Sequence, residues 1–454
     1  MRIESLLIIG CLLAPLPLMA QATDAVSLDY GSAQQRLLEV SDALSATEAE
    51  VRSKAATVGA TRSLGRPDID FEGQLLEYQK TLYLPLGSLA PVAQAFGIPD
   101  PLRFRRQETA VRPIVTVSLP LFTGGLINAT KTGARAKLDQ AQADHRRQTN
   151  KALLQLVQAY YGQQLAEQAL GIRRDVLAGL DQHLADAQKL EREQFISKAQ
   201  RLQAQVARDD GAREFDKAVG DLSTANAVLA GLLRTPQGIR PTTPLFINRQ
   251  PLEPLAHFKQ AALDAHPELH RFRALEAQAQ AGVAIERSKQ LPTIGAFGQY
   301  NFDRRDALLT DSDWAVGLSL RYKIASGLGR NQSVAAARET LYQAEAGRRE
   351  AMVQIEIGVT KAWNDAEAAR SHFLSLNSAL ASAQENLRLQ NLSYREQQAT
   401  SLDVVNAELG LGRARIQRAQ AAYDYVIAFA QLLELSDQII EMPEFAMGSD
   451  RELP

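Results

Sequence analysis

Two short stretches, EREQFISKAQ (191–200) and YREQQATSLD (394–403), carry the same Arg-Glu-Gln triplet 203 residues apart. Three positions after each triplet stands a hydroxyl residue, Ser197 or Thr400, and three positions further a polar one, Gln200 or Asp403. This spacing fits a capping box. In a capping box the hydroxyl group accepts a hydrogen bond from the backbone N–H of the polar residue, and the polar side chain accepts one from the backbone N–H of the hydroxyl residue. Each stretch therefore predicts a tight reversal between two antiparallel helices, with tips near 195–200 and 398–403.

The same offset relates the chain on both sides of these tips. It pairs Gly124 with Gly327 and Tyr160 with Trp363, and beyond the tips it continues as far as Leu232 and Leu435. An offset that stays constant without a gap over about 110 residues indicates the duplication of one element.

Each copy contains a long tract without proline, whereas seven prolines lie between Pro236 and Pro292. The tracts are rich in Ala, Gln, Leu, Arg and Glu, which favour helix. A helical limb from about 125 to 193 would be on the order of 100 Å long, which predicts a rod or a tube. Apolar residues recur at the heptad spacing of a coiled-coil seam, although a soluble helical bundle has the same periodicity. They are Leu170, Leu177, Leu180, Leu184 and Ala187, and Phe373, Leu376, Leu380, Ala383, Leu387 and Tyr394.

Four segments that precede the long helices alternate apolar and polar residues. They are PDIDFEGQL (67–75), VRPIVTVSLPLF (111–122), PTIGAFGQYNF (292–302) and DWAVGLSLRYKI (313–324). A period of two over 9 to 12 residues is typical of transmembrane barrel strands, with one face to lipid and the other to the lumen. Trp314, Tyr300 and Tyr322 lie near strand ends, where an aromatic girdle is expected. Two amphipathic hairpins on a soluble core would give the same pattern.

Four strands cannot close a barrel, and an open strand edge is not tolerated in lipid. Strands that span a membrane would therefore have to share one barrel between several chains, and three chains would supply twelve strands. Glycine permits the sharp change of direction into the long helices at Gly124-Gly125 and at Gly327-Leu328-Gly329. The fold class expected is mainly α with a β-barrel part: an internally duplicated chain with four transmembrane strands and long antiparallel coiled-coil helices per protomer.

These patterns divide the chain into segments. Residues 1–22 are expected to be a signal peptide, because Arg2 precedes an apolar run and Ala20-Gln21-Ala22 forms a cleavage site. Cys11, the only cysteine, lies within it, and lipid attachment there is the weaker alternative. Each repeat is expected to begin with a helix. The first repeat (23–240) contains a β-hairpin at 67–122 and a helical hairpin at 125–234, and the second (258–436) contains a β-hairpin at 292–324 and a helical hairpin at 328–435. A linker at 241–257 joins the repeats, a tail follows at 437–454, and a long extracellular loop is expected at 77–110.

Charge and motifs argue against several classes of function. The chain has 50 basic and 52 acidic residues and a pI near 6.4, which argues against a nucleic-acid partner. His266 and His270 within HPELH could present two metal ligands, but no third ligand and no catalytic constellation accompany them. We therefore expect no enzyme activity, no cofactor and no metal site. A soluble periplasmic coiled-coil adaptor is the alternative to a membrane channel.

The chain resembles the TolC-type outer-membrane efflux proteins from about residue 30 to 436, in both repeats. The matching stretches are LPLFTGGLINATKTGARAKLDQAQA (119–143), HPELHRFRALEAQAQAGVAIERSKQLPTIGAFGQY (266–300) and YREQQATSLDVVNAELGLGRARIQRAQAAYDYVIAFAQLL (394–433). The resemblance implies a homotrimer with a twelve-stranded barrel in the outer membrane of a Gram-negative bacterium and an α-helical tunnel in the periplasm. It also implies a passive exit duct that receives substrates from an inner-membrane RND or ABC pump and a periplasmic adaptor, in tripartite efflux or type I secretion. It does not imply which substrate passes.

The resemblance also implies roles for residues at the helical tips, where acidic side chains narrow the pore in this family. Asp403 matches a tip aspartate, and Gln200 occupies the same place in the first repeat. Tyr394 matches a tyrosine of the network that holds the tip closed. Asn406 stands where some members have a second aspartate, and Ala399 where some have an arginine of the gating network. A constriction at Asp403 and a purely structural capping role both stay open.

Overall fold

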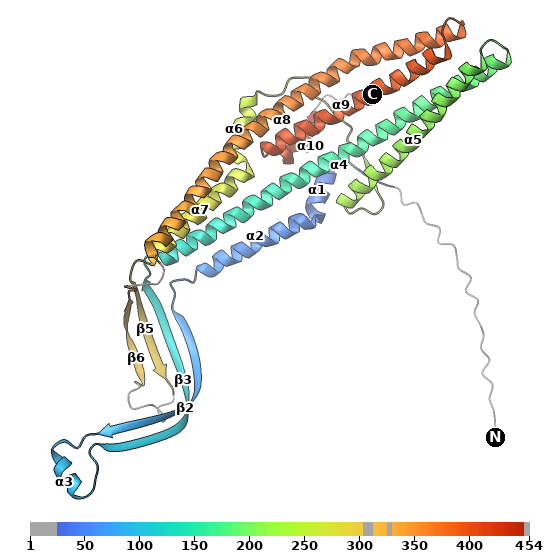
Figure 1. Ribbon diagram of the computed structural model, residues 1–454. Helices are drawn as coiled ribbons and strands as arrows, with labels where there is room; N and C mark the ends of the chain where they lie inside the picture. Colours follow the sequence, from blue (N-terminus) through green and yellow to red (C-terminus); the bar gives the residue numbers. More distant parts are fainter. Residues whose placement is uncertain (1–24, 303–311, 325–328, 449–454) are drawn as a thin grey trace, which may run out of the picture.

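The computed structural model describes residues 25–302, 312–324 and 329–448, so the expected signal peptide and Gly327 lie outside the described residues. The molecule is elongated (Figure 1). The tips of the long helical hairpins lie at one end, and a curled sheet lies at the other end. In chain order the elements are β1 (Val26–Leu28), α1 (Tyr30–Val40), α2 (Asp42–Thr61), β2 (Asp68–Leu84), η1 (Gly87–Leu89), α3 (Ala90–Ala95), β3 (Leu102–Phe122), α4 (Leu126–Arg192), α5 (Lys198–Leu232), β4 (Ile239–Pro241), α6 (Leu255–Ala265), α7 (Pro267–Ser288), β5 (Thr293–Asn301), β6 (Trp314–Arg321), α8 (Arg330–Arg395), α9 (Ser401–Leu435), η2 (Ile439–Glu441) and α10 (Met442–Gly448).

The two helical hairpins repeat each other closely in length. Helices α4 and α8 have 67 and 66 residues, and α5 and α9 have 35 each. Both long helices end in the same way, with Gln194 and Gln397 at positive φ of 65° and 61°. In the first repeat the next amide, Phe195 N, donates to Leu190 O at 2.8 Å, and the equivalent bond in the second repeat is also 2.8 Å. This is the Schellman arrangement, which satisfies carbonyl groups at the end of a helix.

The far ends of α5 and α9 also repeat each other. Arg234 and Asp437, again 203 residues apart, have positive φ of 51° and 59°. Thr235 N donates to Ala230 O at 2.9 Å, and the corresponding amide of the second repeat makes the equivalent bond at 2.8 Å. Among the described residues other than glycine, positive φ therefore occurs at two pairs of positions, each pair separated by 203 residues. The duplication thus extends to the backbone conformation.

The sheet has the antiparallel order β2-β3-β5-β6. Strands β2 and β3 have 17 and 21 residues, and their pairing continues to Leu84 opposite Leu102. The expected lengths of 9 to 12 residues and the expected loop at 77–110 are therefore wrong for this hairpin, because the connection is only 85–101 and holds η1 and α3. Along β2 the apolar residues lie on one face of the sheet up to Leu75 and on the opposite face from Leu76 onward. A prediction that requires one constant apolar face therefore ends β2 near Leu75, too early.

One face of the sheet exposes a row of large apolar side chains. On β2 and β6 they include Ile69, Phe71, Val316, Leu318 and Leu320, which are 68 to 71% exposed. An exposed patch of this kind in a folded protein needs a partner or lipid to cover it. Among the described residues, no helix combines the length and the apolar character needed to cross a membrane.

The strand β3 passes into α4 through two glycines with positive φ, Gly124 at 63° and Gly125 at 90°. A Cβ at Gly124 would lie 2.9 Å from both Ser288 O and Leu291 Cβ, so both the backbone conformation and the space require glycine there. Gly329, before α8, has an ordinary φ of −66°, so its backbone conformation does not itself require glycine.

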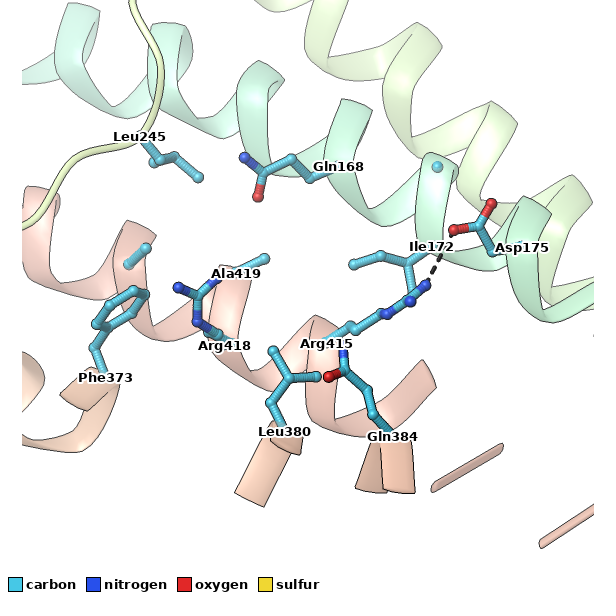
Figure 2. Close-up of a pocket in the computed structure, with 12 residues that line it drawn as sticks. Gln168, Ile172, Asp175, Leu245, Phe373, Leu380, Gln384, Arg415, Arg418 and Ala419 are labelled. Carbon is cyan, nitrogen blue, oxygen red and sulfur yellow. Dashed lines mark hydrogen bonds and ion pairs between the residues drawn. The ribbon is translucent and has the colours of Figure 1, made fainter. Parts of the chain in front are cut away.

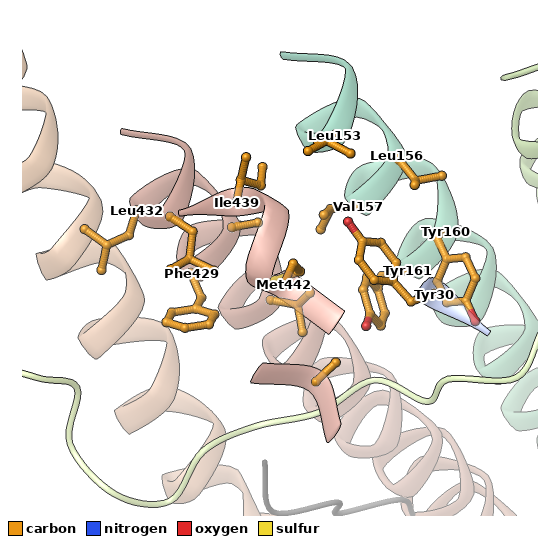
Figure 3. Packing of buried hydrophobic residues seen from close by; sticks show 14 of the residues in the cluster. Tyr30, Leu153, Leu156, Val157, Tyr160, Tyr161, Phe429, Leu432, Ile439 and Met442 are labelled. Atoms are coloured by element: carbon orange, nitrogen blue, oxygen red, sulfur yellow. The ribbon is translucent and has the colours of Figure 1, made fainter. Parts of the chain in front are cut away.

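The main hydrophobic core lies midway along the helices, where α1, α4, α5, α8, α9 and α10 meet. Tyr30, Tyr160 and Tyr161 form its aromatic centre, with ring centroids 5.2 to 5.7 Å apart (Figure 3). The Tyr160 hydroxyl donates to Leu28 O at 2.8 Å and accepts from Thr243 N at 2.9 Å. It thereby attaches the N-terminal strand and the connection between the repeats to α4.

The connection between the repeats is part of this core. Leu245, Phe246 and Ile247, within the linker expected at 241–257, are at most 2% exposed. In the second repeat Trp363 Nε1, the counterpart of Tyr160, donates to Glu253 O at 2.9 Å. The segment expected as a tail also packs inward, with Ile439 and Met442 fully buried. The linker and the start of the tail therefore hold the two hairpins together.

Candidate functional site at the helical tips

The shorter helix of each hairpin, α5 or α9, begins at the tip with a capping box. Asp403 Oδ2 accepts from Thr400 N at 2.8 Å and from Thr400 Oγ1 at 2.6 Å. Gln200 Oε1 accepts from Ser197 N at 3.1 Å. The two copies thus use a carboxylate and an amide in the same structural position, and only the second copy places a negative charge at that position.

The Asp403 carboxylate is exposed, and hydrogen bonds from Thr400 lower its pKa below the usual 3.8. It therefore stays ionised at neutral pH. Asn406, one helical turn further along α9, is exposed as well and shares that face. On this face of α9, Asp403 and Asn406 therefore present one carboxylate and one amide per protomer.

Tyr394 does not lie on that surface. It is 6% exposed and packs against the ring of His183, with centroids 4.9 Å apart. Burial raises the pKa of its hydroxyl, which lacks a hydrogen-bond partner among the described residues. The structure therefore separates Tyr394 from Asp403 and groups it with a buried histidine of the first repeat.

A hydrogen bond between His183 and Ser401 joins the two repeats near the tips. His183 Nε2 lies 2.7 Å from Ser401 Oγ, and both residues are buried. Burial lowers the pKa of His183, so the ring is neutral at pH 7. Because Ser401 is the first residue of α9, this contact fixes the start of α9 against α4.

Close packing of α4 against α9 extends this contact along the helices. A Cβ at Gly179 would lie 2.6 Å from Glu408 Cδ, and a Cβ at Gly412 would lie 2.5 Å from Val176 Cγ2. The Glu408 carboxyl is half-buried, and burial raises its pKa. Glycine on each helix therefore admits a side chain of the other, and the two repeats approach closely near the tips.

A cavity of about 400 Å³ lies further from the tips, between the two helical hairpins. Figure 2 shows side chains of α4, α8 and α9 directed into it. Arg415 Nη1 pairs with Asp175 at 3.1 Å across the cavity, and the Arg418 guanidinium lies 4.8 Å from the centre of the Phe373 ring. The pair of Arg415 with Asp175 joins the repeats a second time, whereas the contact of Arg418 with Phe373 lies within the second repeat.

Sequence reasoning placed Asp403, Gln200, Ser197 and Thr400 at the tips but missed His183. The buried residues of the α4 seam include Val176, Leu180, His183 and Ala187. Their spacing of four, three and four residues is that of a heptad repeat. A histidine at an otherwise apolar position of this repeat was the signal in the sequence that could have identified His183. The expected seam residues Leu177 and Leu184 are only half-buried.

One of the two histidines considered as metal ligands, His266, has a structural role. His266 is the N-cap of α7, and its Nδ1 accepts from Glu268 N at 3.1 Å. Within the described parts of the chain no three His, Cys, Asp or Glu side chains are grouped so as to hold a metal ion.

Comparison with known proteins supports the sequence resemblance. The family model described as outer membrane efflux protein matches residues 259–436, which is the second repeat. The chain is 29% identical to protein CyaE of Bordetella pertussis over 58% of this chain and 57% of CyaE. It is 22% identical to the outer membrane efflux protein BepC of Brucella suis over 87% of this chain and 86% of BepC. It is 24% identical to the alkaline protease secretion protein AprF of Pseudomonas aeruginosa over 82% of this chain and 68% of AprF.

Solved structures share the fold along nearly the whole chain. The structure of CusC superposes with a TM-score of 0.74 at 17% identity and covers 91% of this chain and 93% of CusC. The open state of the Neisseria gonorrhoeae MtrE outer membrane channel gives 0.72 at 16% identity, with coverage of 92% and 93%. The expected fold, a helical tunnel part with a β-barrel part, is therefore confirmed. The alternative of a soluble periplasmic adaptor is discarded, because residues 259–436 match the family of outer membrane efflux proteins.

Proposed function

We propose that three copies of this chain form a passive channel that crosses the outer membrane and continues as a helical tunnel into the periplasm. One observation carries the proposal: a four-stranded sheet with an exposed apolar face and two open edges leads directly into helices of 67 and 66 residues. An open sheet edge is not tolerated in lipid, so further copies must complete the barrel. Helices of this length are on the order of 100 Å long, far beyond a bilayer.

The helical tips form the narrow end of the proposed channel. Three copies of Asp403 around the axis would attract cations, and three copies of Asn406 would add polar groups without charge. Tyr394 acts from inside the wall, because its packing on His183 holds α8 against α4. The Ser197 and Thr400 caps fix the reversals on which these side chains depend.

The proposed partners are a periplasmic adaptor and an inner-membrane RND or ABC pump, which supply the energy and the substrate. The chain itself is a conduit and performs no reaction. The expected segments belong to the proposal: removal of residues 1–22 as a signal peptide, and two repeats at 23–240 and 258–436 joined by the linker at 241–257.

Reconstitution tests the channel directly. Protein purified in mild detergent is expected to elute as a trimer, to migrate differently on a gel after heating, and to give discrete conductance steps in planar bilayers. Cell fractionation should recover it with the outer membrane porins. Protein that stays monomeric and never partitions with lipid would overturn the proposal, as would recovery in the osmotic-shock fraction.

Among the relatives, the name of BepC refers to efflux and that of AprF to alkaline protease secretion. We propose that this chain serves one of these two routes and that the pump selects it. Co-purification with an adaptor and a proton-driven pump would assign small-molecule efflux. Co-purification with an ATP-driven exporter, together with loss of a secreted protein from the medium when the chain is deleted, would assign secretion.

A further inference from the structure

Charged side chains on the polar face of the sheet are concentrated on its two edge strands. Asp68, Asp70 and Glu72 occupy alternate positions of β2, and Arg321 ends β6, followed two positions later by Lys323. Between these strands, the paired segments 114–122 of β3 and 293–301 of β5 contain no charged residue. One edge of the sheet is therefore acidic and the other basic.

These charges share the face opposite the exposed apolar row. Residues directly opposite each other in a sheet lie on the same face. The pairings Asp70 with Thr116, Thr116 with Gln299 and Thr293 with Arg321 connect polar positions from β2 to β6. In a barrel with its apolar face to lipid, the acidic and the basic rows both face the lumen.

Within the described part of one protomer, the acidic row and the basic row form no ion pair with each other. Asp68, Asp70, Arg321 and Lys323 are exposed, and no ion-pair partner for any of them exists among the residues that the structure describes. Glu72 accepts a hydrogen bond from the Gln74 amide at 2.8 Å. Like charges at alternate positions of one exposed strand repel each other weakly in water, and a row of opposite charges on a neighbouring strand would offset that repulsion.

The direction of the strands brings the rows together in a ring of copies. Strand β2 leads away from the helices and β6 leads back, so β6 of one copy pairs antiparallel with β2 of the next. Asp68 begins β2 and Arg321 ends β6, which puts both at the helical end of the sheet. Across one protomer Asp68 lies level with Gly317, four residues from Arg321. A strand tilt of roughly 40° requires a stagger of about five residues per protomer. The nearest even staggers, which keep the side chains on one face, bring Arg321 level with Asp68 or with Asp70 of the next copy.

We propose that the acidic row Asp68, Asp70 and Glu72 of one copy pairs with Arg321 and Lys323 of the neighbouring copy along the lumenal side of the joint between protomers. The partner is a second copy of this chain, and the inference rests on the proposed channel. Pairing of β2 with β2 would oppose two acidic rows, and pairing of β6 with β6 would oppose basic residues. The charges therefore select head-to-tail contacts, which close into a ring, over two-fold contacts, which stop at a dimer. Pairs that are solvated by the lumen contribute to partner choice more than to affinity.

Disulfide trapping in the full-length chain tests the joint. Cα atoms that face each other across antiparallel strands lie within disulfide range, and the only natural cysteine, Cys11, lies in the expected signal peptide. The double variants Asp68→Cys/Arg321→Cys and Asp70→Cys/Arg321→Cys cover the two even staggers that lie nearest to the one set by the strand tilt. One of them is expected to give covalent trimers on a non-reducing gel, whereas each single variant stays uncross-linked. Cross-linked dimers from a single variant, or no cross-link from either double variant, would overturn the proposal.

Charge reversal tests the electrostatic part. Asp68→Lys/Asp70→Lys alone and Arg321→Glu/Lys323→Glu alone are each expected to reduce the fraction of trimer that survives detergent without heating. The four substitutions combined in one chain should restore it, because each joint again opposes unlike charges. No restoration would contradict the ion-pair model. If the unmodified chain is trimeric and conducts while these variants fail, only this inference fails; a monomeric, non-conducting chain would refute the channel as well.

Discussion

At the residue scale, the carboxylate of Asp403 both caps α9 and lies exposed at the tip. Asp403→Asn keeps an oxygen that can accept the Thr400 N–H but removes the charge, so we expect a smaller preference for cations in the reversal potential under a salt gradient. Gln200→Asp is the matched control, since it adds a carboxylate at the equivalent cap and should increase that preference. An unchanged reversal potential in Asp403→Asn would leave Asp403 with the capping role alone.

The pKa of Asp403 adds a pH dependence to this prediction. Because Thr400 lowers that pKa below 3.8, the carboxylate stays charged down to that value. Cation preference should therefore remain nearly constant between pH 7.5 and pH 5.5 and be lost only on stronger acidification. A loss of preference near pH 6 would assign the selectivity to another group.

His183 predicts a different response to acid. Burial lowers its pKa in the folded protein below 6.5, so the unfolded or locally opened state binds the proton more readily. The contact between α4 and α9 should therefore be at full strength above about pH 6.5 and weaken as the pH falls below it. The negative charge of Asp186 raises the pKa of His183 and so partly offsets the effect of burial. Tyr394 and Glu408 line the same pocket as His183.

Hydrogen exchange measures this effect at the start of α9. Amides following Ser401 should exchange faster at pH 5.5 than at pH 7.5, after correction for the intrinsic rate. In His183→Gln, which can still bond to Ser401 but does not titrate, the difference should vanish. A difference that persists in His183→Gln would move the pH response to another residue, such as Glu408.

At the element scale, the capping boxes make the two tips separately testable. Thr400→Ala removes the hydroxyl that accepts Asp403 N, and the loss of such a cap costs about 1 kcal/mol. Faster exchange is expected in the first turn of α9 only, and Ser197→Ala should do the same in α5. Thr340→Ala is the control, since that hydroxyl only donates to Ala336 O within α8. Equal effects of all three substitutions would mean that the caps do not determine where the helices begin.

The elements also differ in how well the sequence specifies them. Helix ends are local, because the Gln194 and Gln397 turns and the two capping boxes depend on residues within one helical turn. Strand ends are not local. The hairpin of β2 and β3 continues beyond Leu75 because the strands still pair while their apolar residues change faces.

At the scale of the whole molecule, the orientation of the sheet is the property to test. Leu318 and Ser319 are neighbours on β6 and point to opposite faces. Leu318→Arg would place a charge in lipid, which costs about 2 to 4 kcal/mol near the middle of the bilayer, whereas Ser319→Arg faces the lumen. We expect Leu318→Arg to lower the unfolding midpoint in urea after folding into lipid vesicles, and Ser319→Arg to leave it nearly unchanged. Equal loss in both variants would argue against the assignment of the two faces.

The sequence by itself determined the duplication, the helical hairpins with their tips, the presence of four strands and the glycines before α4. These features follow from periodicity, caps and backbone sterics, which act between residues close in the chain. Only the tertiary structure decided that His183 meets Ser401, that Glu408 lies on Gly179, and that the linker at Leu245 to Ile247 is core. These contacts join positions that are far apart in the sequence. They depend on how the two repeats pack against each other. No pattern of neighbouring residues in the sequence specifies that packing.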